Sequence, residues 1–157
     1  MAKEIERKFL INRDQLGFLE NGTSIKQGYV STHDKTTVRV RVSGEKAYLT
    51  LKGQTMGVTR SEFEYEIPVI DAEQIITELC GGRVVQKTRY LVTHCNHTWE
   101  VDIFHGDNDG LVIAEIELES EEERFEIPDW VTSEVSGEPK YYNSSLLDNP
   151  FKNWGKA

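Results

Sequence analysis

Charged side chains of one sign recur at every second position in several short segments of this 157-residue chain. Two segments carry paired glutamates, at Glu4 and Glu6 and at Glu115 and Glu117. In an extended strand, residues i and i+2 share a face and lie about 6.6 Å apart. Two carboxylates at that spacing can converge on one hard divalent cation such as Mg²⁺ or Mn²⁺.

Basic side chains repeat this spacing on other segments. The two clearest pairs are Arg39 with Arg41 and Lys87 with Arg89. The fork of donors on an arginine guanidinium matches the geometry of phosphate oxygens. Acidic pairs that hold cations and basic pairs that hold phosphates together describe a site for a metal-bridged oligophosphate.

The charged and apolar residues alternate with a period of two, which predicts β-strands. The expected strands are residues 3–11, 26–32, 36–43, 46–53, 59–67, 83–93, 97–104 and 111–119. Helices are expected from an N-cap at Asp71 to Gly81, from a capping box at Ser120 to the residues before Pro128, and over residues 139–149.

Eight strands, mostly in hairpin order, predict a mainly β (α+β) fold and a single domain over residues 1–157. Closure into an eight-stranded antiparallel β-barrel would remove the exposed edges of the sheet. The charged stripes have two interpretations, a solvated outer face or a lined interior. Because the charged side chains on each strand are nearly all of one sign, we favour a charged interior. The interior of an eight-stranded barrel is wide enough for one small ligand. A few helices would then cover the apolar outer face.

Composition excludes several classes of partner. The net charge of −9 argues against nucleic acid and anionic membranes, which require a basic surface. The chain has no apolar run near the roughly 20 residues of a membrane span, and the N-terminal segment MAKEIERKFL lacks a signal-peptide stretch. We therefore expect a cytoplasmic protein, for which the sequence leaves a homodimer open. Cys80 and Cys95 are expected to be free, buried thiols.

Taken in order, the charged motifs resemble those of the CYTH superfamily, also called triphosphate tunnel metalloenzymes. The motifs are Glu4-Ile5-Glu6-Arg7-Lys8, Arg39-x-Arg41, Lys52 at the end of Leu-Thr-Leu-Lys-Gly, Arg60-x-Glu62-x-Glu64, Lys87-x-Arg89-Tyr90 and Glu115-x-Glu117. Each motif is common by chance, but all six in order over residues 4–117 are specific. The chain looks most like the short bacterial inorganic triphosphatases, and Lys140-Tyr141-Tyr142-Asn143 resembles the family's C-terminal segment.

The resemblance implies a closed tunnel open at both ends, one or two divalent metals and a triphosphate substrate. The first expectation is metal-dependent hydrolysis of the terminal phosphate of inorganic tripolyphosphate. A class IV adenylate cyclase is an alternative, although no stretch can be assigned to a purine pocket. Thiamine or nucleoside triphosphatase activity is a closer alternative. A polyphosphate-binding sensor is disfavoured because Lys8 and both carboxylate pairs are present.

Candidate roles follow from charge and from the resemblance. The candidate metal ligands are Glu4, Glu6, Glu62, Glu64, Asp102, Glu115 and Glu117. The candidate phosphate-binding residues are Arg39, Arg41, Lys52, Arg60, Lys87 and Arg89. Lys8 is the candidate catalytic residue, because nearby cations and metal would lower its pKa enough to move protons. By resemblance, Tyr29 would pair with Lys8, and packing inside the barrel is the alternative role for Tyr29.

Overall fold

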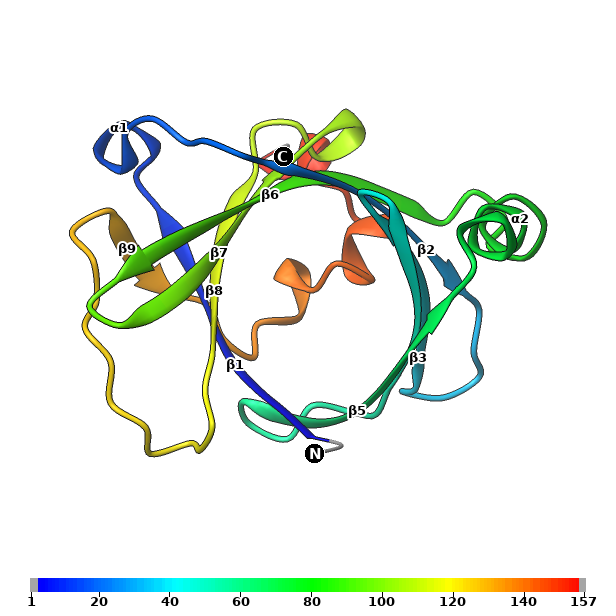
Figure 1. The fold of residues 1–157 in the computed structure, drawn as a ribbon, viewed down its shortest axis with the longest axis horizontal. Coiled ribbons are helices and arrows are strands. Elements are labelled where there is room, and N and C mark those ends of the chain that lie inside the picture. The colour runs from blue at the N-terminus through cyan, green and yellow to red at the C-terminus, as the bar shows by residue number, and fades with distance from the viewer. Residues whose placement is uncertain (1–2, 156–157) are drawn as a thin grey trace.

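The computed structural model describes residues 3–155, whose regular secondary structure is mainly β-strand (Figure 1). The strands are β1 (Lys3–Ile11), β2 (Thr23–Val30), β3 (Thr37–Ser43), β4 (Lys46–Lys52), β5 (Thr59–Ile67), β6 (Val84–His94), β7 (His97–Phe104), β8 (Val112–Glu117) and β9 (Val131–Glu134). The α-helices are α1 (Arg13–Leu16) and α2 (Val69–Leu79). Four 3₁₀ helices complete the described part: η1 (Gly106–Asn108), η2 (Pro139–Tyr141), η3 (Ser145–Leu147) and η4 (Phe151–Asn153).

Eight strands close into an antiparallel barrel, as predicted (Figure 1). Around the barrel the order is β1, β5, β4, β3, β2, β6, β7 and β8, and β8 pairs back with β1. Strand β1 closes the ring by using both of its edges. Glu4 lies opposite Arg60 of β5, and Lys8 lies opposite Glu115 of β8. The N-terminal charged motif is therefore placed between two other charged motifs.

A tight hairpin turn joins β6 and β7. Its two central residues, Cys95 and Asn96, have φ values of 49° and 67°. Paired left-handed residues are typical of the two-residue turns whose twist matches antiparallel strands. The Cys95 side chain is exposed at this turn, whereas Cys80 is buried and both cysteines are free. The expectation of a buried thiol is thus correct for Cys80 and wrong for Cys95.

Helix α2 covers one side of the barrel and packs on β2, β3 and β4. Its buried residues Ala72 and Ile76 join Val40 and Ala47 in one apolar cluster. The close approach of α2 to the barrel depends on Gly28 of β2, where an added Cβ would lie 2.7 Å from the sulfur of Cys80 at the end of α2. Helix α2 begins after Pro68 without a side-chain cap, so the prediction that Asp71 is the N-cap was wrong.

The segment between β8 and β9 covers another side without forming the helix predicted after Ser120. Instead, the Glu123 carboxylate accepts a hydrogen bond from the backbone N–H of Glu119 at 2.6 Å. Phe125 and Trp130 pack on the outward ring of Trp99, with centroids 5.8 Å and 5.6 Å away. Burial of these rings against the barrel decides the conformation, and it overrides the local capping pattern.

The C-terminal segment enters one end of the barrel (Figure 1). After β9 pairs with the end of β1, the chain forms η2 and η3 rather than the α-helix predicted over residues 139–149. Pro139 and Pro150 bound this stretch, and proline lacks the N–H that a continuing helix needs. Tyr141 and Leu146 pack against Phe104 and Ile113 in a buried cluster. The expected tunnel is therefore partly filled at this end.

Two further differences concern the ends of elements and the outer surface. Strand β2 begins at Thr23, earlier than the predicted residue 26. Leu51, Phe63 and Tyr65, on β4 and β5, remain partly exposed, so helices cover only part of the apolar outer face. Within residues 3–155, helices of the length and apolarity needed to cross a membrane are absent.

Candidate active site

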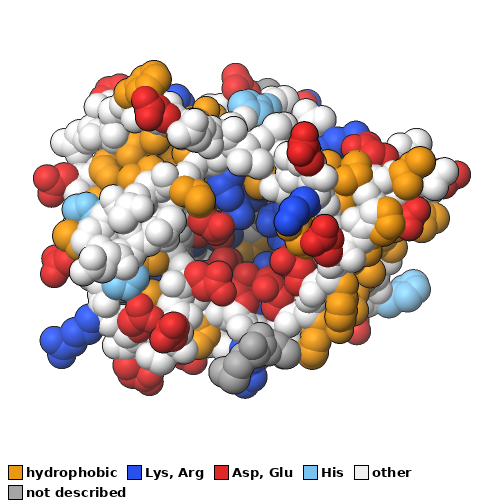
Figure 2. Space-filling view, viewed as in Figure 1, with side chains coloured by type: hydrophobic (Ala, Val, Ile, Leu, Met, Phe, Trp, Pro, Cys, Tyr) orange, Lys and Arg blue, Asp and Glu red, His pale blue; other side chains and the backbone are white. Residues whose placement is uncertain are grey.

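A cavity of about 220 Å³ lies inside the barrel and is lined mainly by charged side chains. Its described acidic residues are Glu4, Glu6, Glu62, Glu64, Glu100, Glu115 and Glu117. Its described basic residues are Lys8, Arg39, Arg41, Lys52, Arg60, Lys87 and Arg89. Figure 2 looks into this hollow, with acidic side chains gathered along its lower side and basic ones along its upper side. Every predicted site residue lines it except Asp102, and Tyr29 also contributes.

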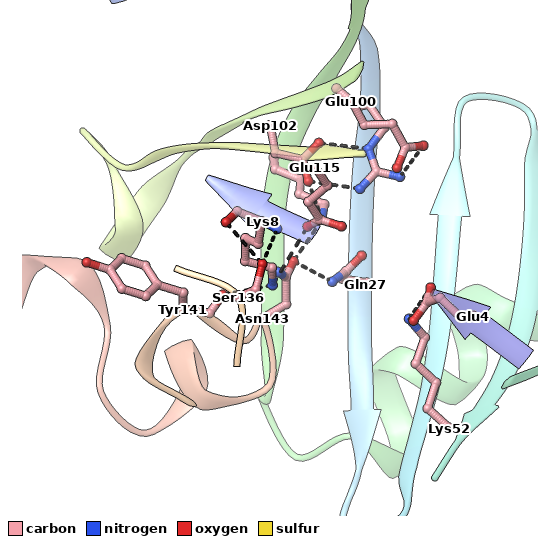
Figure 3. Close-up of polar contacts among 12 residues, drawn as sticks. Glu4, Lys8, Gln27, Lys52, Glu100, Asp102, Glu115, Ser136, Tyr141 and Asn143 are labelled. Atoms are coloured by element: carbon pink, nitrogen blue, oxygen red, sulfur yellow. Dashed lines mark hydrogen bonds and ion pairs between the residues drawn. The ribbon is translucent and has the colours of Figure 1, made fainter. Parts of the chain in front are cut away.

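Strand register places many of these charges opposite a partner of the other sign. Lys52 lies directly across from Glu62, and Arg89 lies across from Asp102. Opposite charges at facing positions stabilise neighbouring strands. The Lys52 ammonium is 3.1 Å from a carboxylate oxygen of Glu62. It is also 3.1 Å from both oxygens of Glu4 (Figure 3). The side chain of Lys52 thereby links β4, β5 and β1.

Carboxylates crowd one another on the acidic side. Burial and the neighbouring carboxylates of Glu115 and Glu4 raise the pKa of Glu6 well above its usual value. Burial opposes ionisation of Glu115 too, but Lys8 and a hydrogen bond from Glu6 hold the pKa of Glu115 well below its usual value. The two carboxyl groups therefore tend to share one proton. Burial and the carboxylate of Glu62 also raise the pKa of Glu117.

Asp102 lies behind the cavity wall, fully buried, and binds two of the basic residues (Figure 3). One carboxylate oxygen is 2.8 Å from the Lys87 ammonium. The Arg89 guanidinium donates to both oxygens, at 2.7 Å and 2.9 Å. These cations outweigh burial and lower the pKa of Asp102. Because both oxygens already accept from cations, Asp102 is arranged to hold Lys87 and Arg89 in place, and its role as a metal ligand stays a prediction.

The two buried lysines of the site have opposite pKa shifts. Burial works against the charged form of Lys8, but with no cation bound the carboxylates of Glu115 and Glu6 raise its pKa, whereas the expected lowering assumed a metal beside it. Burial, together with the Arg89 and Arg41 guanidinium groups, lowers the pKa of Lys87 to about 7 despite Asp102. The difference arises because Lys8 belongs to the acidic side of the cavity and Lys87 to the basic side.

Two arginines hold N–H groups that lack a protein acceptor. Arg39 donates through Nη2 to Thr50 at 3.3 Å, and Arg60 donates through Nη2 to Thr37 at 3.3 Å. The Nε atoms of both arginines are buried without a hydrogen-bond partner among the described residues. An unpaired buried donor costs about 1–3 kcal/mol, or more when it is charged. An anion bound in the cavity would supply the missing acceptors.

Tyr29 is placed for both of its suggested roles. Its ring belongs to the apolar cluster formed with the C-terminal segment, while its hydroxyl accepts a hydrogen bond from Gln27 Nε2 at 2.7 Å. The oxygen of the Gln27 side chain accepts from Arg41 Nε at 2.8 Å. No hydrogen bond joins Tyr29 to Lys8 within residues 3–155.

Gln27 and Asn143 were not among the site residues predicted from the sequence. Gln27 is completely buried, and Asn143 lines the cavity from the C-terminal segment. The register of β2 contained a signal for Gln27, because residues 27 and 29 must share a face. Nothing local to Asn143 places its side chain in the barrel, since that depends on the docking of a segment distant in sequence.

Two openings adjoin the cavity. The first, at the end away from the C-terminal segment, includes Tyr48 and Leu91 beside Arg41 and Arg89. The second is a cleft between the β2–β3 loop, the β4–β5 loop and the C-terminal segment, and it shares Tyr29 and other residues with the cavity. Ligands thus have access even though the C-terminal segment fills part of one end.

The carboxylates do not form a ready-made metal site. Within residues 3–155, three or more His, Cys, Asp or Glu side chains nowhere come together in an arrangement that could hold a metal ion. Lys52 and Lys8 instead lie among the carboxylates as partners. Cation binding at this site therefore requires side chains to exchange partners.

Comparison with known proteins gives consistent results along almost the whole chain. A family model described as the CYTH domain matches residues 2–145. An inorganic triphosphatase of Acetivibrio thermocellus is 49% identical over 154 residues, covering 98% of this chain and 99% of that protein. An inorganic triphosphatase of Nitrosomonas europaea is 36% identical over 147 residues, covering 91% and 95% respectively.

Solved structures share the same barrel. A crystal structure of an inorganic triphosphatase has a TM-score of 0.65 and 32% identity, covering 94% of this chain and 95% of that one. A putative adenylyl cyclase from Hippeastrum, described as having a dominant triphosphatase activity, has a TM-score of 0.53 at 16% identity. It covers 76% of this chain and 80% of that one, a likeness that concerns the fold alone.

Proposed function

The chain belongs to the CYTH family, and we propose that it is an inorganic triphosphatase. In this proposal it hydrolyses the terminal phosphate of linear tripolyphosphate, giving orthophosphate and pyrophosphate, with Mg²⁺ or Mn²⁺ as cofactor. The relatives from Acetivibrio thermocellus and Nitrosomonas europaea carry the same activity in their names.

One observation carries the proposal, namely a single small cavity lined by both basic and acidic residues, with acidic side chains gathered along one side and most basic ones along the other. Arg39 and Arg60 each have a buried Nε–H that needs an acceptor. Guanidinium groups bind phosphate oxygens strongly and with defined geometry. Phosphoryl transfer needs mainly positioning and charge stabilisation, which such a cavity supplies.

A divalent cation fits the acidic side of the cavity. Glu6 and Glu115 tend to share a proton because their charges are crowded, and a hard cation would relieve the same repulsion. A bound oligophosphate would add negative charge to a cavity that already contains these carboxylates. We assign Glu4, Glu6, Glu62, Glu64, Glu115 and Glu117 as the residues that would hold the metal. When bound, Mg²⁺ or Mn²⁺ would neutralise phosphate charge and activate water.

The basic residues bind and orient the substrate in this proposal. Arg39, Arg41, Lys52, Arg60, Lys87 and Arg89 would contact phosphate oxygens. In the absence of a cation the carboxylates of Glu115 and Glu6 raise the pKa of Lys8, and in this proposal Lys8 donates a hydrogen bond or proton to the substrate. Lys8 with Tyr29 would thus stabilise the charge that develops on the leaving pyrophosphate. Asp102 would position Lys87 and Arg89 instead of binding metal.

The test is product analysis by ³¹P NMR with purified protein, using tripolyphosphate, pyrophosphate, ATP and thiamine triphosphate. We expect tripolyphosphate to be cleaved fastest, with activity lost in chelator and restored by Mg²⁺ or Mn²⁺. Pyrophosphate should be a poor substrate because two phosphates cannot reach both sides of the cavity. Cyclic AMP formed from ATP would transfer the assignment to the adenylate cyclases, and tight binding without turnover would indicate a sensor.

A nucleoside or thiamine triphosphatase is the second candidate. Tyr48 lies beside Arg41 and Arg89 at the open mouth of the barrel, where its ring could stack on a base. A Tyr48→Ala variant distinguishes an inorganic triphosphatase from a nucleoside or thiamine triphosphatase. It should leave tripolyphosphate hydrolysis within about twofold of the unmodified protein, and a selective loss on ATP or thiamine triphosphate would favour the second candidate.

A further inference from the structure

The C-terminal segment contributes a polar side chain, that of Asn143, to the lining of the cavity, where it lies beside Gln27 (Figure 3). Asn143, between η2 and η3, accepts two hydrogen bonds at its side-chain oxygen. Lys87 Nζ donates at 2.7 Å, and Gln27 Nε2 donates at 3.0 Å. These donors belong to β6 and β2, so one amide of the tail connects two neighbouring strands.

We propose that Asn143 is a positioning residue of this site and that it orients the Lys87 ammonium toward the substrate. The proposal rests on the triphosphatase function proposed above. It also assigns the C-terminal segment to the active site, in addition to its role as packing at the end of the barrel.

The hydrogen-bonding capacity of Lys87 limits how many of its N–H groups can reach a substrate. A lysine ammonium has three N–H donors. The Asp102 carboxylate forms an ion pair with the ammonium from behind the wall at 2.8 Å, and Asn143 accepts a hydrogen bond from it at 2.7 Å. The side chain of Lys87 is only 1% exposed and lies over the ring of Phe104, 5.5 Å from its centroid. Two fixed acceptors therefore leave a single N–H for a phosphate oxygen in the cavity.

The surroundings of Lys87 explain why such positioning is needed. Arg41 and Arg89 lie close enough to repel the ammonium, and Asp102 attracts it away from the cavity. Asn143 is an uncharged acceptor on the cavity side, so it can hold the ammonium forward without adding negative charge near the substrate. An aspartate at this position would repel phosphate, and an apolar residue would release the lysine toward Asp102.

The bond from Gln27 extends the effect to other site residues. Gln27 donates to both Asn143 and Tyr29, and its oxygen accepts from Arg41. Asn143 thus shares one hydrogen-bond network with Lys87, Tyr29 and Arg41. Hydrogen bonds to charged groups contribute about 1.5–3 kcal/mol each, which corresponds to roughly tenfold or more in affinity.

A double-mutant cycle with Asn143→Ala and Lys87→Met tests the proposal. We expect Asn143→Ala alone to lower kcat/KM for tripolyphosphate by about tenfold or more. In the Lys87→Met background, the same change should have less than about a threefold effect, because only the weaker, uncharged bond from Gln27 remains to be lost. If the Lys87→Met variant turns over too slowly, the cycle is completed with dissociation constants for a hydrolysis-resistant tripolyphosphate analogue with Mg²⁺, measured by calorimetry.

Asn108→Ala is the matched control. The oxygen of the Asn108 side chain accepts a hydrogen bond from the backbone N–H of Phe151 at 2.9 Å, so it also anchors the C-terminal segment. Asn108 is absent from the residues that line the cavity in the described part of the chain. Its substitution should change kcat/KM by the same small factor with Lys87 or Met at position 87. Unfolding curves of all variants show whether each is folded.

The outcomes separate this inference from the proposed function. An equal effect of Asn143→Ala in both backgrounds overturns the positioning role while leaving the triphosphatase assignment intact. Unmodified protein that does not hydrolyse tripolyphosphate, whether or not it binds it, contradicts the proposed function itself. A loss for Asn108→Ala as large as that for Asn143→Ala would reduce Asn143 to a structural anchor.

Discussion

At the scale of single residues, more than one carboxylate in the cavity can pair with the same cation, as Glu115 and Glu6 can with Lys8. Glu115 lies 3.8 Å from the Lys8 ammonium, and its low pKa depends on that cation and on Glu6. If Glu115 loses its charge, the burial that disfavours ionisation of Glu6 remains, but the repulsion from Glu115 disappears. Glu6 can then ionise and replace Glu115 as the partner of Lys8. Charge loss at Glu115 should therefore affect metal and substrate binding more than folding.

We predict that Glu115→Gln and Glu117→Gln each lower metal-dependent kcat/KM for tripolyphosphate by at least about 100-fold. The free energy of unfolding should change by less than about 1 kcal/mol, because the substitution preserves shape and removes crowding. Steady-state kinetics over a range of Mg²⁺ concentrations and urea unfolding measure the two effects. Glu119→Gln, beyond the end of β8 and exposed, is the control and should behave as the unmodified protein. Full activity of both variants at ordinary Mg²⁺ concentrations would disprove the metal assignment.

At the scale of elements, the charged faces of the strands point into the barrel while part of the apolar outer face packs against helix α2. Helix α2 reaches β2 closely at Gly28, where an added Cβ would lie 2.7 Å from Cys80 Sγ and 3.1 Å from Ile76 Cγ1. Because β2 also carries Gln27 and Tyr29 on its inner face, the docking of α2 supports one wall of the site.

We predict that Gly28→Ala destabilises the protein by about 1–3 kcal/mol through overpacking. In a Cys80→Ala background the cost should be smaller, because the nearest contacting atom has been removed. Gly53→Ala is the control, since its added Cβ meets ordinary contacts, the closest at 3.5 Å to Ser61. Chemical denaturation of the four variants measures these differences. The same cost with and without the Cys80 sulfur would contradict the packing explanation.

At the scale of the whole molecule, the barrel holds an unusual amount of charge in its interior. Buried charges are tolerated when they are paired, and each unpaired one is costly. The cavity meets this condition by placing acids and bases opposite one another, with Lys52 between Glu4 and Glu62 as the clearest case. The pairing also means that ligands must replace existing partners, so ligand binding and stability of the whole barrel are linked.

We predict that Mn²⁺ together with a hydrolysis-resistant tripolyphosphate analogue stabilises the whole barrel in a single unfolding transition. At a ligand concentration 100 times Kd, the expected gain is about 2.7 kcal/mol. The stabilisation should be lost in the Glu115→Gln variant and kept in Glu119→Gln, as measured by thermal unfolding. Equal stabilisation of all three proteins would indicate binding outside the cavity.

The sequence by itself determined the closed barrel and most of the lining of its cavity. The reason is that alternation along a strand is a local property, so residues such as Arg39 and Arg41 must share a face wherever the strand lies. Once closure puts one face inside, every predicted site residue except Asp102 follows into the cavity wall.

Only the tertiary structure decided which charges meet. Asp102 shares the inward register, yet it lies behind the wall because Lys87 and Arg89 fold over it. Lys87, rather than Lys8, has the lowered pKa because strand order puts it among arginines. Asn143 enters the site with a segment whose own pattern predicted a helix that does not form. Such pairings depend on contacts between residues far apart in sequence, and the local alternation contains no information about them.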